Sequence, residues 1–380
     1  MRRRFSWSRF RSIVKKEAIQ IKRDKPSLAI ALVMPIMLLF LFGYAVNTDV
    51  EHIATAVWDQ NHSEASRELA QSFTNTEIFS IQSYVSSYAE MEQQIDDGTI
   101  DVGLVIPADY AKKRDSNEPV AVQLLVNGSD PNIARTALSN AQLIIQNQAI
   151  TLQESNLQKQ GLGKLELPVA VESRVLFNPN MESVVFNIPG LIGLIMQNVT
   201  MILTAFSLVR EKERGTMEQL IVTPIRPLEL MLGKITPYVG VGLFSFCIVL
   251  LLGTYWFGVP VKGSISLLVA LSLLFLITTL VLGIFISTVA KTQLQAMQMA
   301  FAFILPSVLL SGFMFPRDSM PLVIQWLGGL VPLTYFLEIL RGIFLKGVDL
   351  TALWRDTLGM TIFCVLMIII AMLRFRKKIE

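Results

Sequence analysis

The sequence contains few of the residues that build cross-links, metal sites and catalytic centres. Its 380 residues include two cysteines and two histidines. Cys247 and Cys364 both stand within apolar runs, so we expect neither a disulfide nor a zinc site. His52 and His62 are too far apart to form a helical pair of ligands, and no cysteine stands near them. The sequence therefore predicts a chain that binds no metal or other cofactor.

A nucleotide-binding loop is also missing. The motif G-x-x-x-x-G-K-[ST] is not completed, because the two Gly-Lys pairs are followed by Leu165 and by Ile235. No cluster of His, Asp or Ser stands inside an apolar run, where an intramembrane enzyme would need one. We expect a protein that is not an enzyme and has no nucleic-acid partner. If ATP powers it, another chain must bind the ATP and Mg.

Charge is scarce as well. Charged residues make up 17% of the chain against 52% hydrophobic residues, and the mean hydropathy is +0.51. Soluble globular proteins average about a quarter charged residues. Since a helical span needs only roughly 20 residues, the chain has room for several spans and one soluble domain. These numbers predict an integral membrane protein.

Long apolar runs predict an α-helical polytopic membrane protein with six transmembrane helices. The predicted spans are Ser27–Val46, Phe186–Val209, Ile235–Phe257, Ser264–Ala290, Leu294–Phe315 and Thr357–Leu373. The piece 321–345 is semi-apolar and is broken by Gly328, Gly329 and Pro332. Irregular backbone survives at membrane depth only where protein or water covers it. We therefore expect a re-entrant segment there and a five-helix region over 186–380.

Basic residues at both ends predict the orientation. Arg2, Arg3 and Arg4 begin a basic stretch before the first span, and Arg374 and Arg376 follow the last. The positive-inside rule then places both termini in the cytoplasm of a multi-pass protein. Residues 47–185 hold 8 Lys and Arg against 19 Asp and Glu, a net charge of −11, and fall outside.

Residues 1–26 precede the first span, which we place at 27–46. Trp7, Phe10, Val14, Ala18 and Ile21 recur at spacings of three and four with basic residues between them. This pattern indicates an amphipathic helix in the inner headgroup region, either a plain anchor or a lever beside the first span. A cleaved signal peptide is the alternative, but the apolar run exceeds the roughly 7 to 15 residues of such a peptide. A retained span is expected.

The segment 47–185 reads as an inserted mixed α/β extracytoplasmic domain. Strand patterns at 52–59, 78–85, 102–107, 120–126 and 169–177 alternate with helical patterns at 63–73, 88–100 and 132–160. Such alternation predicts a partly parallel sheet covered by helices. The long helix at 132–160 is rich in Gln and Asn. Its polar face is either solvated or packed on a second subunit or external partner.

A charged stretch between the second and third spans is the most informative segment. Met217, Leu220 and Ile221 share one helical face, and Glu218 and Gln219 share the other. A short helix near 211–224 can therefore lie flat at the membrane surface. Gly215 precedes it, Thr216 can cap it, and Pro224 ends it.

This stretch resembles the permease subunits of ABC type-2 transporters. The E-R-G-T-x-E-x-L motif runs from Glu213 to Leu220 and is followed by Thr223-Pro224, Arg226-Pro227 and Gly233-Lys234. R-D-K-P at 23–26, S-G-F-M-F-P at 311–316 and P-L-T-Y-F at 332–336 are similar to the same family. The resemblance covers essentially the whole chain, including the large insertion.

The resemblance implies an exporter permease in the bacterial cell inner membrane, paired with a second permease copy or a related permease. A separate ABC ATPase subunit would drive it, with a periplasmic adaptor protein and an outer-membrane channel as further partners. The short helix would be the coupling helix that docks on the ATPase. Its coupling residues are expected to be Glu211, Glu213, Arg214, Gly215, Thr216, Glu218 and Leu220.

Polar residues in the spans suggest a route for cargo. Amide and hydroxyl groups follow the second span at Asn187, Gln197, Asn198, Thr200 and Thr204. They line either a substrate path or a helix contact across the dimer. Glu338 and Arg341 are expected to pair with each other or to close an external gate. The cargo class implied is hydrophobic or amphipathic, a drug or lipid, and its identity stays open. The alternative function is a membrane-anchored scaffold or sensor whose external domain binds a partner.

Overall fold

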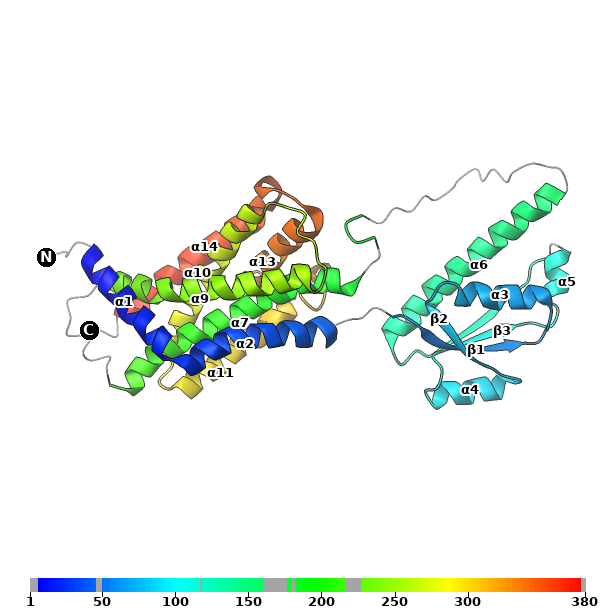
Figure 1. Ribbon diagram of the computed structural model, residues 1–380, viewed down its shortest axis with the longest axis horizontal. Helices are drawn as coiled ribbons and strands as arrows, with labels where there is room; N and C mark the ends of the chain where they lie inside the picture. Colours follow the sequence, from blue (N-terminus) through cyan, green and yellow to red (C-terminus); the bar gives the residue numbers. More distant parts are fainter. Residues whose placement is uncertain are drawn as a thin grey trace. The chain divides into compact units, whose positions relative to one another are not determined.

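The computed structural model describes residues 6–45, 50–116, 118–159, 176–179, 182–215 and 227–376. The chain divides into two compact units, residues 1–47 with 174–380 and residues 48–173. Helices and strands carry the labels of Figure 1. Each unit has its own hydrophobic core, so each is described separately.

Six helices of the first unit are long and apolar enough to cross a membrane, as predicted. They are α2 (Lys25–Ala45), α7 (Ser183–Glu213), α9 (Pro227–Tyr255), α10 (Ile265–Val289), α11 (Gln293–Leu310) and α14 (Leu350–Arg376). Helix α7 extends past its predicted apolar run into charged sequence as far as Glu213, and α9 extends back to Pro227. Helix α14 extends past its predicted run at both ends, from Leu350 to Arg376. Helix α11 ends earlier than predicted, since Gly312 follows with a φ of +88°.

Helices α7 and α10 form the centre of this unit. Within their most apolar windows, 78% of α7 and 67% of α10 is buried, whereas no other span exceeds 33%. Gly283 of α10 faces α7 so closely that a Cβ atom there would lie 2.0 Å from Thr204 Oγ1. Glycine is required at this point because the two helices meet backbone to backbone.

The predicted broken segment consists of short helices. Helix α12 (Leu322–Gly328) is followed by α13 (Pro332–Arg341) and a π-helical turn, η2 (Gly342–Lys346). The two halves are bent by 88°, as in a broken span or a re-entrant loop. Helix α13 packs into the core, and Phe336 stacks on Phe275 of α10 with ring centroids 4.0 Å apart. A single 3-10 turn, η1 (Arg317–Ser319), joins α11 to α12.

Helix α1 (Trp7–Arg23) lies against the first part of α9 (Figure 1). Its Ile13 fills the space over Gly233, where a Cβ atom would come within 2.6 Å of the isoleucine methyl carbon. Trp7 and Ala18, both from the predicted apolar stripe, stay exposed, and the edge that is buried holds Ile13 and Glu17. The buried side of α1 therefore includes a carboxylate, that of Glu17.

The described residues of the second unit include a four-stranded sheet in the order β2-β1-β3-β4. Strand β1 (Ile53–Asp59) is parallel to β2 (Phe79–Tyr84) and β3 (Val102–Ile106), and β3 is antiparallel to β4 (Gln123–Val126). Helices α3 (Glu64–Thr74) and α6 (Pro131–Lys159) cover one face, and α4 (Tyr88–Asp96) covers the other (Figure 1). The short α5 (Tyr110–Asp115) was not expected from the sequence.

The partly parallel sheet with helices on its faces is as predicted. Each βαβ crossover packs its helix on the sheet, so β3 is buried along its whole length and β1 over most of it. Ser63 caps α3 by accepting a hydrogen bond from the Ser66 backbone, which explains where that helix begins. The last predicted strand, 169–177, lies almost wholly outside the described residues.

Candidate functional site

The residues predicted to couple the chain to an ATPase lie where α7 ends. Glu211 is buried in the last turn, whereas Glu213, Arg214 and Gly215 are exposed. Gly215 has a φ of +70°, and its amide donates to the Lys212 carbonyl. A left-handed glycine stops the helix there at little steric cost. Three further predicted residues, Thr216, Glu218 and Leu220, lie outside the described residues.

Glu211 belongs to a buried cluster of charges drawn from three helices. Lys234 Nζ of α9 lies 3.0 Å from Glu211 Oε2 and 2.9 Å from Glu17 Oε1 of α1. Lys16 Nζ also contacts Glu211 and lies 3.3 Å from Glu17 Oε1. The side chains of Glu17, Glu211 and Lys234 are at most 4% exposed. We call these four residues the ion-pair layer.

The ion-pair layer fixes the position of α1, because its buried charges would lose their pairing partners if the helix moved. Removing one partner of a buried ion pair typically costs 3 to 5 kcal/mol, as the remaining charge is left without compensation.

The pKa of Lys16 is raised. Burial works against its charge, but the hydrogen bond to Glu211 and the charges of Glu211 and Glu17 outweigh that effect. A group with a raised pKa contributes its full stabilisation below its ordinary pKa and loses it only as the pH climbs through the raised value. Lys16 therefore stays charged at neutral pH.

A second contact fastens the start of α1 to the start of α9. Arg9 donates through Nη2 to Glu229 Oε1 at 2.8 Å and through Nε to Oε2 at 2.9 Å. The Ser6 amide donates to the same carboxylate at 2.8 Å, and the Glu229 side chain is fully buried. This bidentate geometry is the strong form of an arginine-carboxylate pair. Helix α1 is thus held to α9 at two points along its length.

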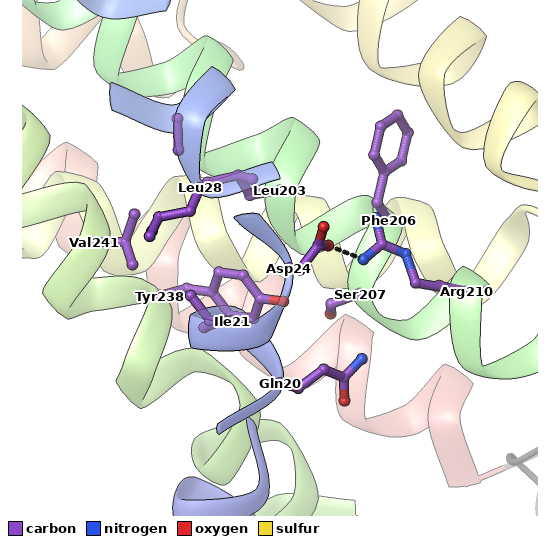
Figure 2. Close-up of a pocket in the computed structure, with 11 residues that line it drawn as sticks. Gln20, Ile21, Asp24, Leu28, Leu203, Phe206, Ser207, Arg210, Tyr238 and Val241 are labelled. Atoms are coloured by element: carbon purple, nitrogen blue, oxygen red, sulfur yellow. Dashed lines mark hydrogen bonds and ion pairs between the residues drawn. The ribbon is translucent and has the colours of Figure 1, made fainter. Parts of the chain in front are cut away.

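A third contact lies at the junction of α1 and α2. Arg210 Nη1 of α7 binds Asp24 Oδ2, as the dashed line in Figure 2 shows. Both side chains line a small cavity of about 30 Å³ together with Gln20, Ser207 and Tyr238. The cavity is large enough for a water molecule. Four elements, α1, α2, α7 and α9, meet around it (Figure 2).

The last turn of α7 also forms hydrogen bonds with the end of α10 and the start of α11. Lys212 Nζ donates to the Ser287 carbonyl and, at 3.2 Å, to the Ala290 carbonyl, both at the C-terminal end of α10. Glu213 Oε1 accepts the Gln293 amide at 2.7 Å at the start of α11, and Glu213 Oε2 accepts from the Gln293 side chain. A cation at a helix C-terminus and an anion at an N-terminus both match the helix dipoles. The end of α7 is therefore joined to four neighbours, α1, α9, α10 and α11.

Two of the predicted polar residues along α7, Thr200 and Thr204, form hydrogen bonds within the chain. Thr200 Oγ1 lies 2.8 Å from Thr279 Oγ1 of α10, and Thr204 Oγ1 donates to the Thr200 carbonyl. Gln197 is buried, and no partner for its Oε1 is found among the described residues. Asn187 and Asn198 are half-buried. A substrate path or dimer contact at these positions stays a prediction.

The expected pairing of Glu338 with Arg341 is not formed. No ion pair joins the two side chains, both of which are described, and Glu338 is exposed. Arg341 instead donates to the Gly312 carbonyl at 3.0 Å, and its guanidinium lies 3.9 Å above the ring of Phe186. The Nε and Nη2 atoms of Arg341 are buried without a hydrogen-bond partner among the described residues, while the Glu338 carboxylate is turned to the surface. An external gate at these residues remains a prediction.

Sequence reasoning missed most of the ion-pair layer. Lys16, Glu17 and Lys234 were not among the predicted site residues, and neither were Arg9 and Glu229 of the second contact. Two signals were present: Glu17 is the only acidic residue in α1, and Glu229 and Lys234 are the only charges in α9. An isolated charge of minority sign inside an amphipathic or apolar helix calls for a partner. No group of three or more metal-ligating side chains occurs in the part of the chain that the structure describes.

Residues 26–373 match the protein family described as ABC-2 family transporter protein. The chain belongs to this family. The match confirms the resemblance seen in the sequence and contains the whole end of α7 with its partners in α9, α10 and α11. Members of this kind are the non-catalytic membrane subunits, so the chain is a transporter permease rather than an enzyme.

Three named relatives illustrate the similarity. The probable multidrug ABC transporter permease YbhS of Escherichia coli strain K12 is 35% identical over 378 residues, covering 99% of this chain and 98% of YbhS. The probable multidrug ABC transporter permease YbhR of the same organism is 30% identical over 369 residues, covering 97% of this chain and 98% of YbhR. ABC transporter G family member 20 of Dictyostelium discoideum is 26% identical, and the match covers 97% of this chain but 50% of that protein.

Proposed function

We propose that this chain is the permease of an ATP-driven exporter that moves a hydrophobic or amphipathic cargo out of the cytoplasm or inner membrane. A separate ABC ATPase subunit binds ATP and Mg and docks on the loop between α7 and α9. Two permeases, identical or related, form the membrane core. The names of YbhS and YbhR support a multidrug cargo for those relatives, and we extend that cargo class to this chain.

One observation carries the coupling proposal. The loop that follows Gly215 leaves α7 directly after Glu211, Lys212 and Glu213, and the chain re-enters α9 just before Glu229 and Lys234. All five of these side chains are fastened to another helix. A displacement of the loop by a docked ATPase is thereby passed to α1, α10 and α11 together. A loop that only connected two spans would need none of these contacts.

The charge distribution supports the proposed orientation. The segment 47–185 has a net charge of −11 and the whole chain a net charge of +3, so the remaining residues have a net charge of +14. Basic residues in α1 then face the cytoplasm, and the α/β unit lies in the periplasm. A periplasmic adaptor protein and an outer-membrane channel are the partners that such a unit would receive. Cargo identity and the choice between a homodimer and a heterodimer are left to experiment.

The test is co-purification with an ATPase from the native host in mild detergent, followed by measurement of ATP hydrolysis. Glu218→Lys reverses a charge in the docking loop, and Glu92→Lys reverses an exposed charge on α4 as a matched control. We expect Glu218→Lys to lower ATPase binding or permease-stimulated hydrolysis roughly tenfold, because a charge-assisted contact is lost. Glu92→Lys should behave as wild type.

The opposite result has a clear meaning. If the wild-type chain elutes without any ATPase under conditions that keep other membrane complexes intact, the exporter proposal fails. A membrane-anchored scaffold or sensor, whose folded α/β unit binds a partner, would then be the better interpretation.

A further inference from the structure

A basic cleft lies between the end of α7, the end of α1 and the start of α11. Its volume is about 620 Å³. Four cationic side chains line it, Lys16, Arg23, Arg210 and Arg214, against one carboxylate, Asp24. The cleft adjoins the small cavity of Figure 2, with which it shares Gln20, Asp24 and Arg210.

Two of the four cations have no carboxylate to offset them. Lys16 is engaged with Glu17 and Glu211, and Arg210 is engaged with Asp24. No ion pair is recorded for Arg23 or Arg214 within the described residues, and both side chains are exposed. The cleft therefore gathers like charges that repel one another unless an anion enters. A phosphate group is the anion that arginine forks hold most readily.

The surroundings of the cleft are those of a membrane surface. Ile19 lines it and is 45% exposed, and Trp7 on the same helix is 69% exposed. Beside α1, an apolar groove of about 470 Å³ lies among α1, α2 and α9, lined by Leu28, Leu32 and Phe244 with Lys22 at its edge. Amphipathic helices with exposed aromatic and aliphatic residues lie at the boundary between headgroups and acyl chains. A free phosphate would gain nothing from these apolar residues.

We propose that the cleft is a binding site for the phosphate headgroup of an anionic phospholipid of the inner leaflet, with its acyl chains lying along α1. Arg23 and Arg214 supply the charges that the headgroup neutralises. The bound lipid would bridge α1 to the C-terminal end of α7, beside the docking loop. The inference shares with the proposed function only the cytoplasmic placement of α1.

The experiment is a titration of the delipidated, detergent-solubilised protein with phosphatidylglycerol, followed by native mass spectrometry. Arg23→Gln with Arg214→Gln removes the two uncompensated charges. Arg11→Gln with Lys15→Gln removes two exposed cations of α1 that do not line the cleft, as a charge-matched control. We expect the cleft variant to bind phosphatidylglycerol at least roughly tenfold more weakly. Binding to the control variant and binding of phosphatidylcholine to all forms should not change.

Three results would overturn the proposal. Equal losses in both variants would mean that total charge, not the cleft, attracts the lipid. Full displacement of phosphatidylglycerol by an equal concentration of inorganic phosphate would indicate a phosphate site without a lipid. Normal lipid binding by the cleft variant with loss of the co-purified ATPase would assign the cleft to an acidic surface of that subunit. A chain that binds the lipid through the cleft yet binds no ATPase would refute the exporter proposal and leave the lipid site standing.

Discussion

At the residue scale, Lys234 illustrates how buried charge specifies a structure. Its ammonium group is shared by Glu17 and Glu211, which come from two other helices and are as buried as Lys234 itself. Such a cluster adds little net stability, because taking charges out of water costs about as much as their attraction returns. We infer that its value is specificity, because the observed register of α1 against α7 and α9 brings all three side chains together.

Replacing Lys234 with methionine should destabilise the protein by about 3 to 5 kcal/mol, because two buried carboxylates then face each other with Lys16 alone to offset them. The triple replacement Glu17→Gln, Glu211→Gln and Lys234→Met should recover most of that loss, since no buried charge remains. Thermal unfolding in detergent, followed by tryptophan fluorescence, measures both effects. Lys15→Met, at an exposed position of α1, is the control. Additive losses in the triple variant would show that the three residues act independently.

At the element scale, the contact between α7 and α10 depends on Gly283, which has no side chain. An alanine at position 283 would place a Cβ atom 2.0 Å from Thr204 Oγ1 and 2.5 Å from the Met201 carbonyl oxygen. Neither atom can move far, because Thr204 is hydrogen-bonded to the Thr200 carbonyl and Met201 is helical backbone. Two helices that are otherwise held apart by side chains therefore touch here.

Gly283→Ala should lower stability by about 1 to 3 kcal/mol or more through overpacking. Gly240→Ala on α9 is the matched control, because a Cβ atom there meets nothing within 4 Å. That control should be neutral or slightly stabilising, since alanine favours a helix over glycine by about 1 kcal/mol. The difference in unfolding temperature between the two variants is the readout. Equal behaviour of the two variants would contradict the close approach.

Sequence patterns predicted the elements far better than their connections. Apolar runs located six spans, and strand patterns, two of them continuous apolar runs, located β1 to β4, because both signals are local. The ion-pair layer was not predicted, because Glu17 and Lys234 are 217 residues apart and their meeting depends on how three helices pack. Within the candidate site, Glu211 and Gly215 were predicted from the charged stretch, but the buried partner of Glu211, Lys234, could be found only from the fold. The ends of α7 and α9 were also missed, since tertiary ion pairs let both helices continue past their apolar runs.

At the scale of the whole molecule, the two units differ in kind. The α/β unit, 48–173, buries its core on both faces of a sheet, and the helical unit buries α7 and α10 while leaving the other spans largely uncovered. Uncovered apolar helices need lipid or a second permease around them, whereas the α/β unit can stand in water.

Cysteine labelling in spheroplasts checks the proposed orientation. In a background with Cys247 and Cys364 replaced by alanine, we expect Asp97→Cys in the α/β unit to react at once with a membrane-impermeant maleimide. Arg11→Cys in α1 should react only after the membrane is permeabilised, because we propose that α1 lies on the cytoplasmic side. Both positions are exposed in the structure. The reverse pattern would place the α/β unit in the cytoplasm and remove the basis for an external adaptor.

Helix α9 combines a clamped end with an internal proline. Its first two turns carry Glu229 and Lys234, which bind α1, and Pro237 follows one turn later inside the helix. Proline removes the hydrogen bond that would hold the Gly233 carbonyl, so the helix bends most easily there. Helix α9 can therefore act as two segments joined at Pro237. The short first segment is ion-paired to α1, so the two are expected to move together. If an ATPase docks on the loop as proposed, its displacement is expected to bend the first part of α9 about Pro237 while the apolar remainder of the helix stays in the bilayer.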